Sequence, residues 1–179
     1  MNYADQIEGN PQKLVLQDVA AFYRQYHRDI LAFTNSLVHD LDLAEEFAHD
    51  VFYKLCLDIQ KGGVANINIR AYLFRVARNH CIDHFRKKKI NTSDIDAVAY
   101  SLGKNGEQKR IENGMLIETI YAFVEMNFPE EEKSVFKLKF YHECSQEEIA
   151  GIMEISPATV SRIVKRIAEK LNNEFPEIL

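Results

Sequence analysis

The sequence predicts an all-α protein built from two small helical domains joined by a flexible linker. Only 7 glycines and 4 prolines occur among the 179 residues, which disfavours a turn-rich β-sandwich. Apolar residues recur at steps of three and four, and no stretch long enough for a sheet alternates with period two. The clearest stripe consists of Phe22, Tyr26, Ile30, Phe33 and Leu37. This spacing is typical of the buried face of an amphipathic helix.

Breaks in the helical pattern divide the chain into three parts. Residues 1–89 carry helical periodicity and are expected to form the first domain, with a loop at residues 61–68 where the sequence reads KGGVANIN. Residues 90–113 are rich in Asn, Ser and Gly and hold few large apolar side chains, so we expect a linker. Periodicity resumes at Met115, and residues 114–179 are expected to form the second domain.

Several classes of protein are disfavoured by composition. No apolar run approaches the roughly 18 residues of a membrane span, which predicts no membrane insertion. The first ten residues, MNYADQIEGN, have no basic and apolar signal pattern, and this indicates a cytoplasmic protein. The cysteines, Cys56, Cys81 and Cys144, lie far apart and are interpreted as buried thiols of a reducing compartment.

Catalysis has little support in the sequence. The six histidines are scattered, and no glycine-rich phosphate loop or nucleophile–base pair is apparent. His80 and His84 have a spacing that metal ligands can use, but no further ligand lies nearby in the sequence. We therefore expect no enzyme activity, no cofactor and no metal site.

Charge is divided between two neighbouring segments. The net charge of the chain is -5, but residues 40–58 hold six acids and one base, whereas residues 70–89 hold seven bases and one acid. Adjacent helices of opposite sign indicate two partner surfaces of different chemistry on one small protein.

The C-terminal segment predicts a helix-turn-helix. Ser145 and Glu148 form a capping-box pattern, and Ser156 followed by Pro157 marks a second helix start eleven residues later. A short helix over 146–153, a turn at Glu154 and a longer helix over 157–172 would follow. The second helix of such a motif enters the major groove. The residues expected to contact DNA are Ser156, Thr159, Ser161, Arg162, Lys165 and Arg166.

Three stretches together resemble a known family. They are LAEEFAHDVF at 43–52, IRAYLFRVARNHCIDHFRKKK at 69–89, and NFPEEEKSVFKLKF at 127–140 ahead of the helix-turn-helix. In this order they resemble the bacterial sigma factors of the extracytoplasmic-function group, small members of the sigma-70 family. The chain departs from the usual pattern in placing Tyr72 where relatives have Trp, and Glu154 where relatives have Gly in the turn.

The resemblance implies partners. The acidic stretch is similar to the one that docks on the β′ clamp helices of core RNA polymerase, and 127–140 to the helix that binds the β flap. Charge would steer the first encounter and apolar side chains would supply packing. An anti-sigma factor is a further implied partner. The implied polymerase-binding residues are Glu45, Glu46, Phe47, Asp50 and Phe52.

The basic stretch is similar to the promoter-melting and minus-ten recognition helix. Strand opening needs cations for phosphates, flat rings on which unpaired bases stack, and polar groups that read an extruded base. Helical phasing leaves open whether the rings of Tyr72 and Phe74 face DNA or lie in the core. The implied minus-ten residues are Asn66, Arg70, Tyr72, Phe74, Arg75, Arg78, Asn79, Arg86 and Lys87. The helix-turn-helix would then read the minus-thirty-five element of promoter DNA.

Two other functions remain alternatives. A stand-alone helix-turn-helix regulator would dimerise or sense a signal through its N-terminal helices without touching polymerase. A sigma-like decoy would bind an anti-sigma factor without binding DNA. The acidic stretch and Asn79 disfavour the first alternative, and the arginines and the capped recognition helix disfavour the second.

Overall fold

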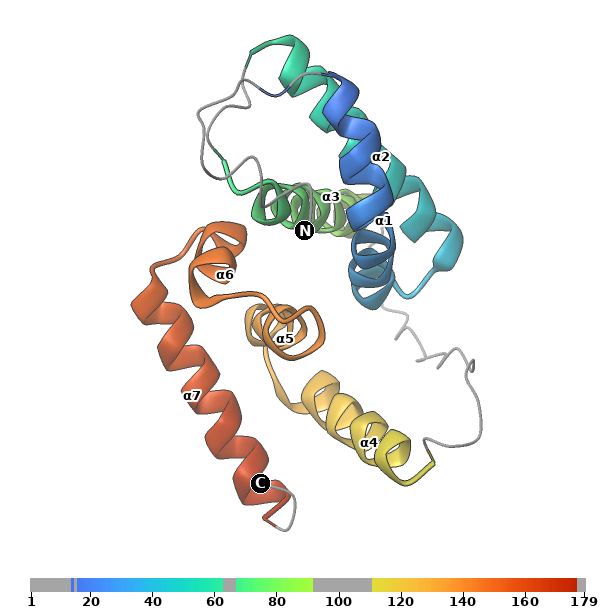
Figure 1. Ribbon diagram of the computed structural model, residues 1–179. Coiled ribbons are helices and arrows are strands. Elements are labelled where there is room, and N and C mark those ends of the chain that lie inside the picture. Colours follow the sequence, from blue (N-terminus) through green and yellow to red (C-terminus); the bar gives the residue numbers. More distant parts are fainter. Residues whose placement is uncertain (1–13, 15, 63–66, 92–110, 177–179) are drawn as a thin grey trace. The chain divides into compact units, whose positions relative to one another are not determined.

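The computed structural model describes residues 14, 16–62, 67–91 and 111–176, and all regular elements in these ranges are helices (Figure 1). The chain divides into two compact units, Met1–Tyr100 and Ser101–Leu179. The prediction of an all-α protein with two helical domains is confirmed.

The N-terminal unit consists of three helices that pack against one another: α1 (Leu16–Val38), α2 (Leu41–Gln60) and α3 (Ile69–Asn91). Phe22, Ile30 and Phe33 of the predicted stripe are buried on α1, and Leu37 at its end is half-buried. Val51 and Leu55 of α2 and Leu73 of α3 are fully buried and complete this core. The apolar periodicity therefore identified the packing face of α1.

A tight turn joins α1 to α2. His39 has a left-handed backbone with φ of 56°, and the Asp40 side chain caps α2 by accepting a hydrogen bond from the Leu43 amide at 3.1 Å. The buried Thr34 hydroxyl reaches the Ile30 carbonyl at 2.8 Å and the Ala44 carbonyl at 3.2 Å, where it is placed to donate. A polar side chain inside the core is thus satisfied by both helices.

The C-terminal unit begins with α4 (Ile111–Asn127) and α5 (Glu130–Phe136), which continues into a short π-helix, η2 (Lys137–Tyr141). Helices α6 (Gln146–Met153) and α7 (Pro157–Glu174) follow. Helices extend into both ends of the expected linker, residues 90–113, because α3 continues to Asn91 and α4 already begins at Ile111. Residues 92–110, the remainder of that linker, lie outside the described ranges.

The predicted helix-turn-helix is confirmed at α6 and α7. The Ser145 hydroxyl accepts from the Glu148 amide at 3.1 Å, while the Glu148 carboxylate accepts from the Ser145 amide at 2.8 Å. Ser156 caps α7 by accepting from the Thr159 amide at 3.1 Å. Glu154 between the helices is left-handed, with φ of 57°. Local capping chemistry therefore set both helix starts.

Candidate nucleic-acid interface

Helix α7 has one buried and one exposed side. Val160, Ile163, Ile167 and Leu171 face the core of the unit. Ser161, Arg162 and Lys165 are exposed, as expected for side chains that reach into a DNA groove. The Ser156 hydroxyl, also exposed, is engaged in the cap of α7, and the half-buried Thr159 hydroxyl accepts a hydrogen bond from Arg162 at 3.1 Å.

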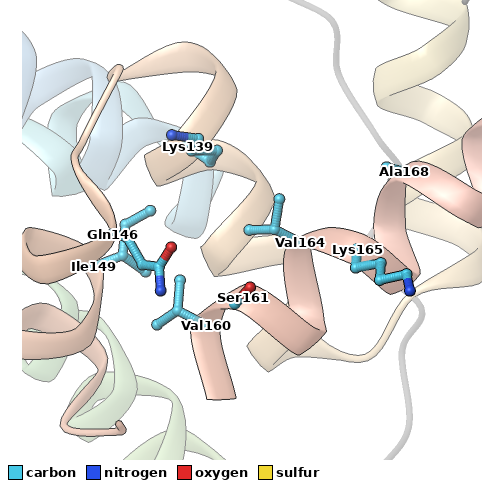
Figure 2. A pocket seen from close by; sticks show the side chains of 8 residues that line it. All are labelled: Lys139, Gln146, Ile149, Val160, Ser161, Val164, Lys165 and Ala168. Atoms are coloured by element: carbon cyan, nitrogen blue, oxygen red, sulfur yellow. The ribbon is translucent and has the colours of Figure 1, made fainter. Parts of the chain in front are cut away.

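A groove of about 230 Å³ lies beside this exposed side (Figure 2). Its apolar lining comes from α6 and α7 and includes Ile149, Val160 and Val164. Lys139 of η2 and Lys165 of α7 also line it. Near it, the Gln146 amide donates to the Pro157 carbonyl at 2.8 Å, which joins the starts of the two helices.

Arg166 differs from the other predicted DNA-contacting residues of α7. Its guanidinium donates a hydrogen bond to the carboxylate of Glu132 on α5, a residue that is only 4% exposed. Arg166, which was expected to contact DNA, therefore already has a partner within the protein. No sequence pattern indicated this pair, because 34 residues separate its members.

Helix α3 presents the predicted basic face. Asn79, Arg86 and Lys87 are exposed, while Arg75 and Arg78 are half-buried. Arg86 lies 3.2 Å from Asp83, the one acid of this segment. Arg70, also half-buried, places its guanidinium 5.5 Å from the centre of the Phe74 ring. Asn66 lies outside the described residues.

The two aromatic residues expected to stack on unpaired bases are buried in this structure. Phe74 is 0% exposed and packs on Phe33, with ring centres 5.1 Å apart. Tyr72 is 8% exposed, and its hydroxyl donates to Asp58 at 2.7 Å. The burial of both rings favours the alternative that helical phasing left open, in which they lie in the core. Phase alone did not reveal that Asp58 on α2 holds the Tyr72 side chain inward.

The Tyr72–Asp58 contact is part of a small polar network between α2 and α3. Lys54 donates to both oxygens of Asp58, at 2.7 and 2.9 Å. These bonds, chiefly that of Lys54, hold the pKa of Asp58 below its ordinary value. Burial, followed by the Asp58 contact, raises the pKa of Tyr72. The phenol therefore stays protonated and serves as a hydrogen-bond donor.

Comparison with known protein families gives two matches, one in each unit of the chain. The family model for Sigma-70 region 2 matches residues 22–90, which lie in α1–α3, and the model for Sigma-70, region 4 matches residues 128–171, which run from the residues just before α5 into α7. Together they cover more than half of the chain.

The chain belongs to the sigma-70 family. It is a sigma factor of the extracytoplasmic-function group, a transcription initiation factor that directs RNA polymerase to promoters. Similar proteins include the ECF sigma factor SigM of Bacillus subtilis, which is 26% identical over 149 residues, covering 83% of this chain and 90% of SigM. SigW of the same organism is 26% identical over 144 residues, covering 75% and 76% of the two chains.

A solved structure shares the fold of the sigma factor. It is the sigma factor RpoE of Bartonella quintana, crystallised in complex with the anti-sigma factor NepR. The TM-score is 0.67 at 20% identity, and the match covers 92% of this chain and all of that chain. This likeness supports the two-domain helical architecture.

The acidic helix α2 of the sigma factor exposes part of the set expected to bind polymerase. Glu45 and Glu46 are exposed and Asp50 is half-buried, 3.9 Å from His80 of α3. Phe47 and Phe52 are 6% and 4% exposed and belong to the core. Because both rings pack inside the unit, their role as apolar contacts for polymerase stays a prediction. Large apolar side chains that α2 does expose are Leu41 and Tyr53.

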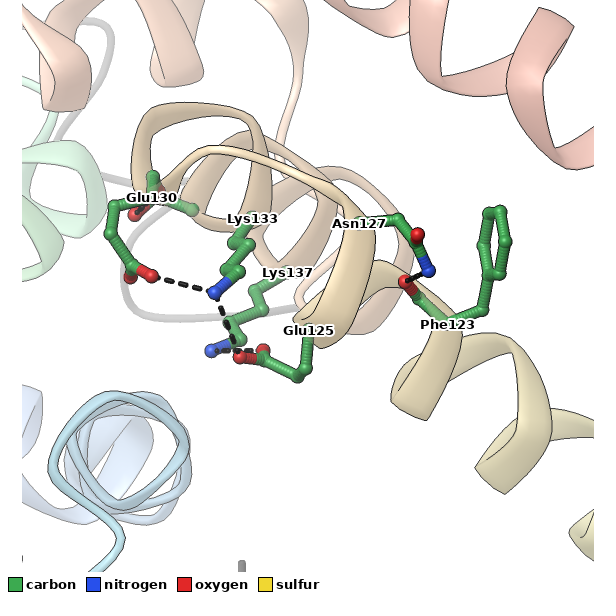
Figure 3. A network of polar contacts seen from close by, with 7 residues as sticks. Phe123, Glu125, Asn127, Glu130, Lys133 and Lys137 are labelled. Carbon is green, nitrogen blue, oxygen red and sulfur yellow. Dashed lines mark hydrogen bonds and ion pairs between the residues drawn. The ribbon is translucent and has the colours of Figure 1, made fainter. Parts of the chain in front are cut away.

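An ion-pair network joins α4 to α5 and η2 of the sigma factor (Figure 3). Lys137 is 2% exposed and lies 2.8 Å from Glu125, which also lies 3.7 Å from Lys133. Lys133 in turn donates to Glu130 at 2.6 Å. Burial lowers the pKa of Lys137, and the hydrogen bond with Glu125 opposes that shift. The sequence did not indicate that the charged side chain of Lys137 is buried.

Apolar residues of 127–140 divide between core and surface. Val135, Phe136 and Leu138 are buried, whereas Phe140 is half-exposed, as is its neighbour Tyr141. Among the described residues there is no cluster of three or more metal-ligating side chains. In the same ranges, none of the helices is both long and apolar enough to span a membrane.

Proposed function

We propose that each surface of this sigma factor has one partner. The exposed carboxylates of α2 bind the β′ clamp helices of core RNA polymerase, and the exposed basic face of α3 opens the minus-ten element. Helix α7 reads the minus-thirty-five element. The domains are assigned as 1–89 for polymerase binding and melting, 90–113 as linker, and 114–179 for minus-thirty-five recognition.

The observation that carries this proposal is the arrangement of charge in the N-terminal unit. Packed neighbours α2 and α3 expose Glu45 and Glu46 on one helix, and Asn79, Arg86 and Lys87 on the other. An acidic surface suits a basic protein partner, whereas cations around an amide suit phosphates and a base edge.

The C-terminal unit supports two further contacts. Phe140 and Tyr141 are half-exposed at the end of η2 and supply an apolar surface for the β flap. Ser161, Arg162 and Lys165 face outward on α7 and form the minus-thirty-five contact. Arg166 is assigned mainly to its internal pair with Glu132.

An anti-sigma factor is proposed as the regulating partner, in line with the family and with the complex known for RpoE of Bartonella quintana. The site of action is the cytoplasm, where promoter DNA and core polymerase meet. No catalytic role or cofactor is proposed, because binding free energy and base capture suffice to open a short stretch of duplex.

Run-off transcription tests the proposal. Core polymerase, this protein and a pool of genomic promoter fragments are combined, and transcripts that vanish without the protein are expected. Binding to core without transcripts, together with capture of an anti-sigma factor, would favour the decoy. Binding to DNA fragments without binding to core would favour a stand-alone regulator.

A further inference from the structure

Helix α3 exposes a pair of large apolar side chains within its basic face. Ile82 is 43% exposed and Phe85 is 44% exposed. They are three residues apart, so they are neighbours on the helix surface. Arg86 and Lys87 follow directly and are exposed, and Asn79 precedes Ile82 by one turn. An apolar pair thus lies among cations and an amide.

The core of the unit does not account for this pair. The side of α3 that packs on α1 and α2 carries Leu73, Phe74, Ala77 and Cys81, all of which are 1% exposed or less. Phe85 has an edge contact with His84, with ring centres 5.7 Å apart, and leaves much of its surface open. Burying the remaining exposed surface of a phenylalanine ring is favourable, so an open ring favours contact with a partner.

Phe85 also supplies α3 with an exposed aromatic ring, which Tyr72 and Phe74 do not. The helix holds three phenylalanine or tyrosine rings, Tyr72, Phe74 and Phe85, and the first two are buried. Proteins that hold single strands combine a basic track with an open ring on which a base stacks. Phe85 is the ring of α3 that meets this requirement.

We propose that Phe85 stacks on a promoter base that strand opening unpairs, with Ile82 beside it excluding water and Arg86 and Lys87 holding the adjacent phosphates. The proposal rests on the assignment of α3 to the minus-ten element and adds the residue that captures a base by its flat face. The alternative occupant, an apolar patch of polymerase, is an outcome of the test below.

The test uses the full chain with core polymerase and a promoter that the wild-type protein opens. A 2-aminopurine placed in the minus-ten element reports unpairing, and core binding is measured separately by fluorescence anisotropy. Stacking contributes about 1–3 kcal/mol per base, so Phe85→Ala should reduce open complex roughly 5- to 150-fold. Core binding should stay within about twofold of wild type.

Two conservative variants separate stacking from simple apolar packing. Phe85→Trp keeps a flat ring and should retain opening, whereas Phe85→Leu keeps apolar volume without a ring and should lose it as Phe85→Ala does. Ile117→Ala removes an exposed apolar side chain of α4 and serves as the matched control, with opening unchanged. Photocrosslinking from 5-iodouracil in the minus-ten element should label position 85.

Each contrary result has a clear meaning. Full activity of Phe85→Leu, or a parallel loss of core binding and opening, would overturn the proposal in favour of a contact with polymerase. Unchanged opening by Phe85→Ala would overturn it outright. Failure of the wild-type protein to open any promoter would instead refute the proposed function as a whole.

Discussion

Arg166 on the recognition helix donates a hydrogen bond to Glu132, a buried carboxylate on α5. The pair ties α7 to the helix at the start of region 4, and these two helices are in direct contact. A buried carboxylate without its cation is costly, because it has lost its hydration. Both arginines are exposed, but Arg166 has a structural role through this pair, whereas Arg162 donates to Thr159 on the same helix.

Salt dependence should distinguish the two arginines. The association constant of the holoenzyme for promoter DNA falls with salt. Arg162→Gln is expected to reduce the magnitude of the slope of its logarithm against log salt by about 0.9, because one phosphate contact is lost. Arg166→Gln should leave this slope nearly unchanged but lower the free energy of unfolding by about 1–3 kcal/mol. Equal slopes for wild type and Arg162→Gln would contradict the assignment.

Substitutions at the turn between α6 and α7, and within α6, should stabilise the folded protein. Glu154 is left-handed, a conformation that costs a residue with a Cβ about 1–2 kcal/mol, so Glu154→Gly should raise the free energy of unfolding by about 1 kcal/mol. Gly151→Ala is the reverse exchange inside α6, where an added Cβ meets nothing within 4 Å, and should also stabilise, by about 0.5–1 kcal/mol. Urea denaturation measures both, and destabilisation by Glu154→Gly would argue against the turn geometry.

Loss of the Tyr72 hydroxyl should weaken the junction of α2 and α3. Tyr72→Phe keeps the ring but leaves Asp58 without one donor, and we expect a loss of about 1.5–3 kcal/mol in the free energy of unfolding. The folded pKa of Asp58 lies below 3.8, so the stabilisation is present above that pH and is lost as pH falls through the folded pKa. The difference between Tyr72→Phe and wild type should therefore shrink in acid denaturation below pH ~4. A difference that stays constant would mean that the hydrogen bond contributes little.

Protonation of His27 at acidic pH should also lower the stability of the fold. Burial lowers its pKa below 6.5, with His49 adding to the shift and Glu45 opposing it, and its buried Nε2 atom has no hydrogen-bond partner among the described residues. The unfolded chain therefore binds the proton more readily, and stability is expected to fall as pH drops through 6.5. His27→Gln should flatten this part of the curve, measured by urea denaturation at several pH values. A curve that keeps its slope would assign the effect to another group.

Asn79→Ala should separate opening from docking. The exposed amide lies within the cations of α3, so its loss is expected to reduce open-complex formation about 5- to 150-fold, as for one lost bidentate base contact. Core binding should change little, because the acidic surface is intact. Equal losses in permanganate footprinting and in core binding would exclude base capture by Asn79.

Sequence reasoning succeeded where the determining chemistry is local. The capping box of Ser145 and Glu148 forms as predicted, and Ser156 caps the helix start that Ser156 and Pro157 predicted. Apolar periodicity likewise identified the core positions of α1.

It failed where a side chain's environment depends on another helix. Phe47 and Phe74 carry apolar surface that could serve either a partner or the core, and only the packing of three helices decides for the core. The Tyr72 side chain is turned inward toward Asp58, 14 residues earlier, whereas the exposed Arg166 side chain pairs with Glu132 on another helix. Such pairs leave no periodic signal, because their members lie on different elements.

The division of charge between α2 and α3 has a consequence for anyone who handles the protein. A net charge of -5 suggests a molecule that a cation exchanger would reject, yet two packed helices of one small unit carry charge of opposite sign. Such a molecule is an electric dipole and turns its matching face to whichever charged surface it meets. Heparin and a quaternary-amine resin should both retain it at low ionic strength, and both should release it as salt shortens the Debye length to below about 8 Å.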